Sequence, residues 1–234
     1  MGFIPKIKIC LILFISFSTG ISPAQENKEN PYGLKIIATV AEYQQLIQGD
    51  SLQKLVDLEK VIPGIRLDIR YATSNNFTHN VVYTNAKAYA RVEVARALSD
   101  IENDLKKKGL GLKIYDAYRP YAATLLFYKI MKSAVFVAAP WQGSRHNRGC
   151  AVDVNLISLK TGKELEMPTA FDDFSEKASP TFMDLPATAL KNRQVLMEVM
   201  ARHGFTVFPD EWWHFDFRGW EKYGLLDLTF EELN

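Results

Sequence analysis

The chain has 234 residues, of which 47% are hydrophobic, enough for one large domain with a sizeable core. Its 28 lysines and arginines nearly balance its 27 aspartates and glutamates, so the net charge is +1. This balance gives no electrostatic reason to expect a nucleic-acid or anionic-membrane partner, and any charged chemistry must be local.

The first 24 residues have the layout of a secretory signal peptide. A small positive region precedes an apolar run from Ile9 to Ile21, and small residues ending at Ala24 lead into a polar stretch. The apolar run is short for the roughly 20 residues that cross a bilayer, so we favour cleavage over an uncleaved anchor. We expect export to the periplasm or secretion, without stable membrane insertion after cleavage. The predicted parts are a signal peptide at 1–24, a flexible leader at 25–33 and one folded domain at 34–234.

Helices and strands then follow one another without a regular rhythm, which is typical of an α+β domain. The clearest helix spans Ala90–Lys107, where apolar residues recur at spacings of three and four and Gly109 suits the C-terminal cap. We expect a single domain with a central, mostly antiparallel sheet flanked by helices. The other predicted elements are a helix at Ala41–Gln48, two short strands around a Pro63-Gly64 turn within Leu55–Ile69, a loop at Ala72–Asn80, a strand at Leu112–Ala117, a helix at Ala122–Val137, a strand at Cys150–Ile157, a helix at Ala187–His203, and strands at Phe205–Phe208 and Trp213–Phe217.

Two of the four histidines stand in segments typical of a metal site. The first segment runs from Ser144 to Asp153, and Gly149 within it permits a sharp turn before a strand. Along that strand Asp153 and Asn155 share a small, polar face that suits a site. His146 precedes the turn, so His146 and Asp153 are candidate ligands.

The second segment joins a histidine to a carboxylate among aromatic residues. Glu211 stands three positions before His214, where a carboxylate is costly unless it has a partner or a task. Two histidines and one carboxylate are a standard set for catalytic zinc, which keeps its fourth position for water. A second carboxylate that does not bind metal can serve as the base. Positions 211 and 214 face opposite sides of an ideal strand, so Glu211 must lie on the preceding turn or a bulge must intervene.

Four other residues are of types that can take part in chemistry. Arg119 follows a strand and precedes Pro120, and beside a metal site it would polarise a scissile carbonyl, although a surface position is the commoner one. Cys150 shares an apolar strand face and has no electropositive neighbour on it, which favours packing over nucleophilic chemistry. His203 at a helix C-terminus is explained by the helix dipole, and His79 is expected on the surface.

Together the segments resemble the D-alanyl-D-alanine dipeptidases of the VanX type, within the larger group of zinc D-Ala-D-Ala peptidases. The resemblance runs from roughly Leu55 to Phe217. The group pattern Ser-x-His-x-x-Gly-x-Ala-x-Asp matches Ser144–Asp153, and Glu-x-x-His matches Glu211–His214. Segments similar to the dipeptidase branch are found at 70–78, at Tyr118-Arg119-Pro120 and at Phe171-Asp172-Asp173-Phe174.

The resemblance implies a hedgehog/DD-peptidase-like fold and one zinc ion per chain, held by His146, Asp153 and His214. It implies that Glu211 is the catalytic base and that Arg119 stabilises the tetrahedral intermediate. The folded domain would then be the catalytic domain of a zinc dipeptidase.

The resemblance also implies a small dipeptide substrate, D-Ala-D-Ala. Asp172 and Tyr71 would hold its free amino group, and Ser144 would contact it. Two alternatives stay open. One is a carboxypeptidase or peptidoglycan-peptide peptidase of the same group, and the other is a non-catalytic cell-wall-binding module stabilised by its metal. The second alternative requires a closed four-ligand site, and neither remaining histidine lies in a motif.

Overall fold

The computed structural model describes residues 1–2, 30–134 and 137–233. The predicted signal peptide, except its first two residues, and most of the predicted leader lie outside the described residues. Within the described ranges, no helix is both long enough and apolar enough to cross a membrane.

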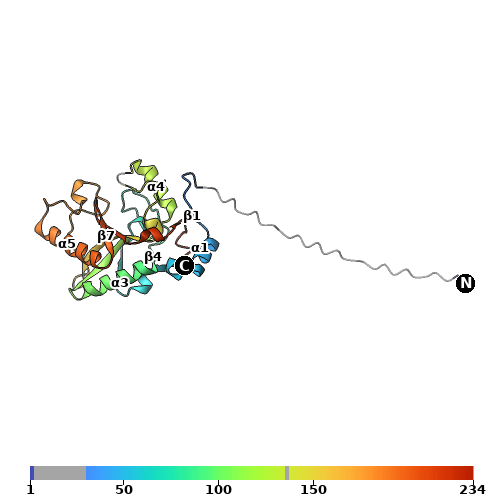
Figure 1. The fold of residues 1–234 in the computed structure, drawn as a ribbon, viewed down its shortest axis with the longest axis horizontal. Helices are drawn as coiled ribbons and strands as arrows, with labels where there is room; N and C mark the ends of the chain where they lie inside the picture. The colour runs from blue at the N-terminus through green and yellow to red at the C-terminus, as the bar shows by residue number, and fades with distance from the viewer. Residues whose placement is uncertain (3–29, 135–136, 234) are drawn as a thin grey trace.

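Helices and strands form one α+β domain (Figure 1). The α-helices are α1 (Val40–Gly49), α2 (Leu58–Val61), α3 (Val92–Lys106), α4 (Tyr121–Met131) and α5 (Ala187–Arg202). Short 3-10 turns are η1 (Ser51–Gln53), η2 (Arg70–Ala72), η3 (His146–Arg148), η4 (Glu176–Ala178) and η5 (Trp220–Lys222). The strands are β1 (Ile36–Ile37), β2 (Leu55–Asp57), β3 (Arg66–Leu67), β4 (Tyr89–Arg91), β5 (Leu110–Asp116), β6 (Ala151–Ser158), β7 (Phe205–Phe208), β8 (Glu211–Phe217) and β9 (Leu225–Leu226).

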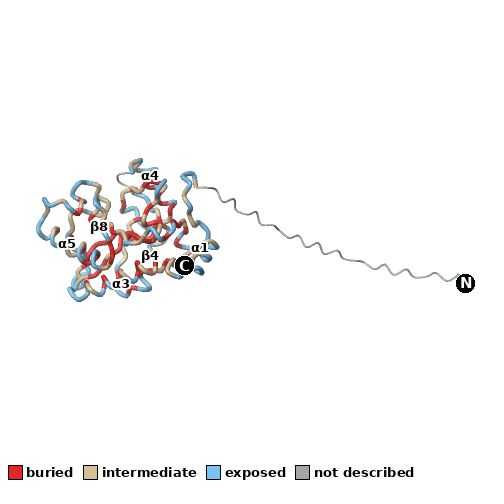
Figure 2. Tube along the Cα trace, viewed as in Figure 1, coloured by how far each residue is buried: buried red, intermediate tan, exposed pale blue. Residues whose placement is uncertain are grey.

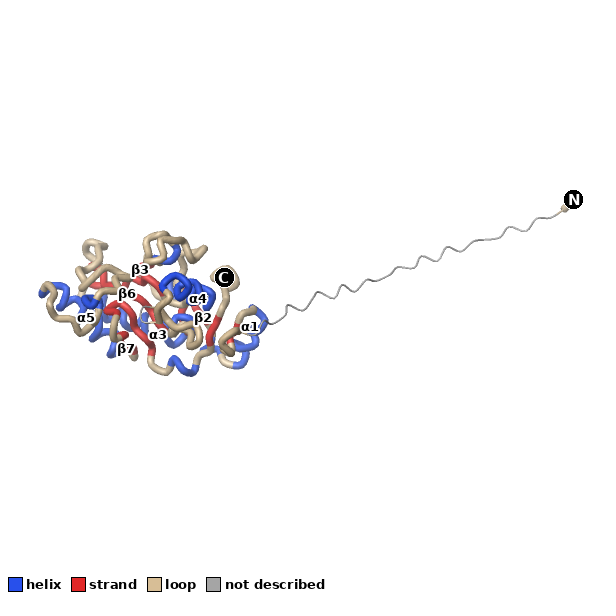
Figure 3. Tube along the Cα trace, turned by 90° about the horizontal axis from the view of Figure 1, so that it is seen from above, coloured by secondary structure: helices blue, strands red, loops and turns tan. Residues whose placement is uncertain are grey.

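The central sheet has five strands in the order β3-β5-β6-β8-β7. Only the β3–β5 pair is parallel, which confirms the mostly antiparallel sheet. Helices α3 and α5 contact each other and pack against β5, β6 and β7, so both cover the same face. In Figure 3 the strands run through the middle of the domain, with α5 towards one end and α1 towards the other. Two small sheets, β2–β4 and β1–β9, complete the fold.

Two predicted elements differ from the structure. The region Leu55–Ile69 does contain two short strands, but α2 separates them and they belong to different sheets. The Asp57 side chain accepts a hydrogen bond from the Glu59 amide and thereby begins α2. Helix α4 ends at Met131 instead of Val137, because Lys132 adopts a left-handed backbone conformation with φ of 51°. An alternating apolar pattern does not reveal which sheet a strand joins, and Lys132 is no sequence signal for a helix end.

The core gathers through the middle of the domain and includes β4 and much of β8 (Figure 2). Arg91 is one of the charged residues that are fully buried. Its guanidinium donates to the backbone carbonyl oxygens of Arg148 at 2.6 Å, of Gly224 at 3.0 Å and of Gln53. Because each of its three nitrogen atoms has an acceptor, the buried charge is tolerated and joins three distant segments. One of them is the turn that precedes β6.

Candidate active site

Three polar side chains form a row across the central sheet. Asp116 on β5 pairs with Asp153 on β6, and Asp153 pairs with His214 on β8. Residues directly opposite each other on adjacent strands project to the same face, which brings these side chains together. The face they share is the one that lines a cavity of about 400 Å³.

His146 reaches this row from η3, and Gly149 makes that approach possible. Gly149 has a φ of 68°, in the left-handed region that favours glycine. A Cβ atom at this position would lie 2.5 Å from Leu55 Cδ2, so the buried Leu55 side chain would have to shift to admit it. The predicted sharp turn is therefore confirmed, and it folds His146 back over the start of β6.

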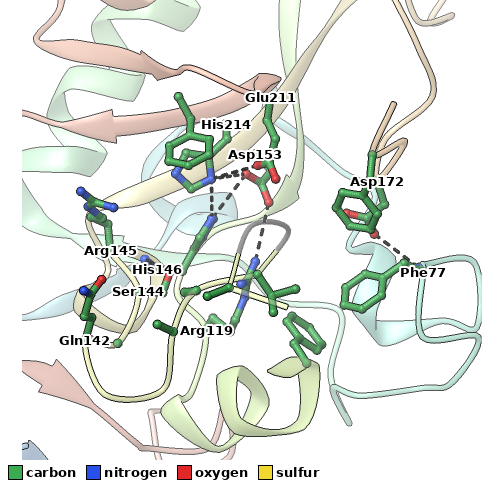
Figure 4. A pocket seen from close by; sticks show the side chains of 18 of the residues that line it. Phe77, Arg119, Gln142, Ser144, Arg145, His146, Asp153, Asp172, Glu211 and His214 are labelled. Atoms are coloured by element: carbon green, nitrogen blue, oxygen red, sulfur yellow. Dashed lines mark hydrogen bonds and ion pairs between the residues drawn. The ribbon is translucent and has the colours of Figure 1, made fainter. Parts of the chain in front are cut away.

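The three candidate ligands meet at one point (Figure 4). His146 Nε2 lies 3.1 Å from His214 Nδ1. Asp153 Oδ1 lies 3.1 Å from His214 Nδ1 and 3.4 Å from His146 Nε2. One ligand atom from each residue thus lies within 4.8 Å of the others.

In each of the two histidines, the ring nitrogen that faces away from the cluster forms a hydrogen bond, and this bond determines whether the nitrogen that faces the cluster can bind a metal. His146 Nδ1 donates to the carbonyl oxygen of Ala117 at 2.6 Å, and His214 Nε2 donates to Asp216 Oδ1 at 3.1 Å. In neutral imidazoles with these donors, the two nitrogens that face each other carry lone pairs. Two lone pairs 3.1 Å apart repel each other unless a metal ion or a proton lies between them. Burial lowers the pKa of His214, but its hydrogen bonds to Asp153 and Asp216 outweigh this and raise it to about 10, so this ring takes up a proton when no metal is bound. A ligating histidine that donates its other ring proton to a carbonyl or carboxylate is the usual arrangement at metal sites.

Asp153 is the third candidate metal ligand. Its Oδ1 atom is buried and has no hydrogen-bond partner among the described residues. Burial raises the pKa of the Asp153 carboxyl, but His146 and His214, which are charged or donate hydrogen bonds to it when no metal is bound, lower the pKa below its ordinary value, so the group is ionised. An unpartnered buried carboxylate oxygen beside two imidazole lone pairs fits a divalent cation such as zinc.

Glu211 is the first residue of β8, beside an irregularity in the sheet. The β7–β8 register shifts between Val207 and Phe208, so of the two predicted possibilities the structure has the interruption of regular pairing, and Glu211 does not lie on the preceding turn. This interruption allows Glu211 and His214 to approach on one side, with Glu211 Oε2 3.8 Å from His214 Nδ1. Burial raises the pKa of Glu211 to about 7, the range in which a carboxylate exchanges protons near neutral pH.

Arg119 is buried beside the same cluster instead of on the surface. Its Nε and Nη2 atoms donate to Asp116 Oδ2 at 3.0 and 2.8 Å, and Nη2 lies 3.8 Å from Asp153 Oδ2. Its guanidinium also stacks over the rings of Tyr71 and Phe127, at 5.4 and 4.8 Å from their centroids. These contacts hold a fixed positive charge at the cavity wall.

The sequence reasoning missed Asp116 as a functional residue. Its carboxylate accepts from both Arg119 donors, from the Tyr83 hydroxyl at 3.1 Å and from the Ala117 amide at 2.9 Å. The only signal in the sequence was the Asp-x-x-Arg spacing at a strand end. Its importance appears only when β5 is paired with β6.

Asp172 lies on another side of the cavity, towards Phe77 (Figure 4). The Tyr71 hydroxyl donates to Asp172 Oδ1 at 3.1 Å, and the Phe77 amide donates to Oδ2 at 3.5 Å. Burial, with a smaller contribution from Asp153, raises the pKa of Asp172 to about 8. Its φ of 62° is unusual for a residue other than glycine, and such strain is concentrated at functional positions. A carboxylate held in this way lacks a cation.

All the predicted site residues line this one cavity. Ser144 is among them, although its Oγ also accepts a hydrogen bond from the His146 amide at 3.2 Å and so shapes the turn. The predicted residues that the cavity brings together are Tyr71, Arg119, Ser144, His146, Asp153, Asp172, Glu211 and His214.

The remaining histidines and Cys150 lie elsewhere. His79 is exposed, as predicted, and His203 ends α5, where its Nε2 lies 3.0 Å from Asp104 Oδ2. Cys150 is fully buried, and burial raises the pKa of its thiol to about 12. Its surroundings do include positive charge, from Arg91 and Arg148, contrary to the sequence-based expectation. Burial outweighs that charge, so the conclusion that Cys150 packs as a small hydrophobe holds.

Comparisons with known proteins give a family match, several relatives and similar solved structures. A family model described as D-ala-D-ala dipeptidase matches residues 51–230. A D-alanyl-D-alanine dipeptidase of Escherichia coli (strain K12) is 32% identical over 173 residues, which cover 74% of this chain and 89% of the relative. A D-alanyl-D-alanine dipeptidase of Enterococcus faecium is 28% identical over 181 residues, covering 69% of this chain and 90% of the relative. A solved structure of VanYB in complex with D-alanine-D-alanine is 18% identical, covers 58% of this chain and 75% of that chain, and has a TM-score of 0.38.

Proposed function

Because the chain belongs to the D-ala-D-ala dipeptidase family of peptidases, we propose that it hydrolyses the D-alanyl-D-alanine dipeptide with the help of one zinc ion per chain. The observation that carries this proposal is the meeting of two imidazole nitrogens and one buried carboxylate oxygen without a hydrogen-bond partner beside Glu211. When bound by His146, Asp153 and His214, zinc would lower the pKa of a bound water towards about 7.

Glu211 moves the protons of the reaction. Its carboxylate accepts a proton from the attacking water and passes it to the amine of the leaving residue. A pKa of about 7 suits both halves of that task, since the group releases a proton as readily as it accepts one at neutral pH. The short distance between Glu211 and His214 supports this role.

Arg119 stabilises the negative charge that develops on the carbonyl oxygen. Asp116 and the aromatic rings of Tyr71 and Phe127 hold its guanidinium before substrate arrives, so little reorganisation is needed during the reaction. Asp116 is a positioning residue in this account, because it acts through Arg119.

Asp172 selects substrates with a free amino group next to the scissile bond. Its carboxylate is buried without a cation, and the ammonium of a dipeptide would supply one. Tyr71 keeps the carboxylate in place, and Ser144 lies in the same cavity as a further contact to substrate. A longer peptide carries an amide at that point and cannot make the ion pair.

The test joins metal analysis to a panel of D-Ala-D-Ala, L-Ala-L-Ala and N-acetyl-D-Ala-D-Ala. We expect about one zinc per chain and rapid hydrolysis of D-Ala-D-Ala alone. Equal hydrolysis of the N-acetylated compound would instead favour a carboxypeptidase. Bound metal without hydrolysis of any compound would favour the non-catalytic module. A matched control is Glu211→Gln, which should keep the metal and lose the activity.

We also propose that the protein is exported and cleaved after Ala24, on the strength of the N-terminal sequence pattern. Sequencing the N-terminus of the protein recovered from its producing cell tests this. A chain that still begins at Met1 would contradict it.

A further inference from the structure

Arg145 is a second arginine in the cavity, and nothing in the reaction described above uses it. It directly precedes the ligand His146 and lines the cavity together with Gln142. Figure 4 shows Arg145 and Gln142 on one side of the metal-ligand cluster, and Asp172 with Phe77 on the other. The cavity therefore has an acidic end and a basic end, with the candidate ligands between them.

The charge of Arg145 is available for a ligand. Its Nε atom is buried and has no hydrogen-bond partner among the described residues. Asp216 Oδ2 forms an ion pair with Nε at 3.7 Å, which is longer than a hydrogen bond, so the N–H donors of the guanidinium are not engaged by that carboxylate. The other oxygen of Asp216 already accepts from His214. Arg119 differs in this respect, because Asp116 engages two of its donors.

The guanidinium of Arg145 is also held in a defined orientation. It stacks over the Trp220 ring, with 4.8 Å between its carbon and the ring centroid. Stacking engages the flat face of a guanidinium and leaves its edge, which carries the N–H donors, free to bind. The side chain is 41% exposed, so a ligand entering the cavity can reach that edge.

We propose that Arg145 binds the carboxylate of the leaving residue of the substrate. This inference rests on the proposed dipeptidase function. Two residues in extended conformation span about 7 Å, and a dipeptide carries an ammonium at one end and a carboxylate at the other. With Asp172 at the ammonium and Arg145 at the carboxylate, the scissile carbonyl falls between them. The planar fork of arginine matches a carboxylate with two parallel hydrogen bonds. The charges at the two ends of the cavity thus select substrates of dipeptide length.

The rival interpretation is that Arg145 acts only through Asp216, by orienting the carboxylate that holds His214. The two interpretations differ in one respect. A carboxylate-binding residue distinguishes a free acid from the corresponding amide, whereas a residue that orients a metal ligand affects both substrates alike.

The experiment compares D-Ala-D-Ala with D-Ala-D-alaninamide in the zinc-loaded wild type, Arg145→Gln and Arg145→Lys. We expect the wild type to prefer the acid by about 10- to 100-fold in kcat/KM, the range for a hydrogen bond between charged groups. Arg145→Gln should lose that preference through a higher KM for the acid, with the amide little changed. Arg145→Lys should restore part of it, because the charge returns without the fork. Arg148→Gln is the matched control, since Arg148 stacks on the same Trp220 but does not line the cavity.

Equal loss on acid and amide in Arg145→Gln would overturn the inference in favour of the rival role. Equal hydrolysis of acid and amide by the wild type would overturn it while leaving the proposed function intact. Hydrolysis of neither compound by the zinc-loaded wild type would overturn the proposed function, and this inference with it.

Discussion

Asp172→Asn should make the metal-free protein more stable and the loaded enzyme less active. The folded protein holds the pKa of Asp172 at about 8, against 3.8 for the free side chain. Between those values the folded state keeps a proton that the unfolded state has lost, so stability falls as pH rises. The slope is about 1.4 kcal/mol per pH unit, or about 3 kcal/mol from pH 5 to pH 7. Since the side chain is partly exposed, solvent screening makes this an upper limit.

Asparagine has nearly the same shape and no charge to bury, so the variant should lack this slope. Urea unfolding of chelator-treated wild type and Asp172→Asn at pH 5, 6 and 7 measures it. The variant should already have the higher free energy of unfolding at pH 5, and the gap between the two proteins should widen by about 3 kcal/mol between pH 5 and pH 7. In the zinc-loaded enzyme, kcat/KM for D-Ala-D-Ala should fall about 100-fold or more, as expected when one partner of a buried ion pair is removed. Asp173→Asn, the same change one position later and outside the cavity lining, serves as the control.

Parallel pH curves for wild type and Asp172→Asn would refute this reasoning, because they would mean that the Asp172 carboxylate ionises as easily in the folded protein as in the unfolded one. Loss of stability at pH 7 in the variant would refute it as well. Either result would mean that the Asp172 carboxylate is not destabilised by burial and so has no particular tendency to bind the substrate ammonium.

Three further predictions follow from the same geometry. Asp116→Asn should destabilise the fold by about 3–5 kcal/mol in urea unfolding and lower kcat/KM at least tenfold, because it leaves Arg119 buried without its carboxylate; unchanged values in both would contradict the positioning role. Gly149→Ala should cost about 2–4 kcal/mol by the same assay, from the left-handed backbone and the clash with Leu55. Iodoacetamide should not label Cys150 in the native protein but should label it in urea, as read by peptide mass spectrometry; rapid native labelling would show that the thiol is reachable.

Local patterns predicted much of the fold. The apolar spacing of Ala90–Lys107 predicted α3, whose observed bounds are Val92–Lys106. The alternating segment after Gly149 predicted β6, and Gly149 itself predicted the turn, because glycine adopts a left-handed backbone without the steric cost that other residues have. The predicted helix ending at Val137 was too long, since a left-handed Lys132 depends on contacts and not on residue type. The roles assigned to the site residues remain proposals, although the structure gathers those residues around one cavity.

The sequence by itself determined which side chains are available for chemistry and the local geometry around them: a histidine before a glycine turn, an aspartate on the polar face of the following strand, and a glutamate three residues before a second histidine. Only the tertiary structure decided what those side chains face. Pairing of β5, β6 and β8 sets Asp116, Asp153 and His214 in one row. The interruption of regular pairing at the start of β8 turns Glu211 towards that row. The physical reason is that strand register and burial depend on contacts between distant segments, which spacing along one segment does not encode.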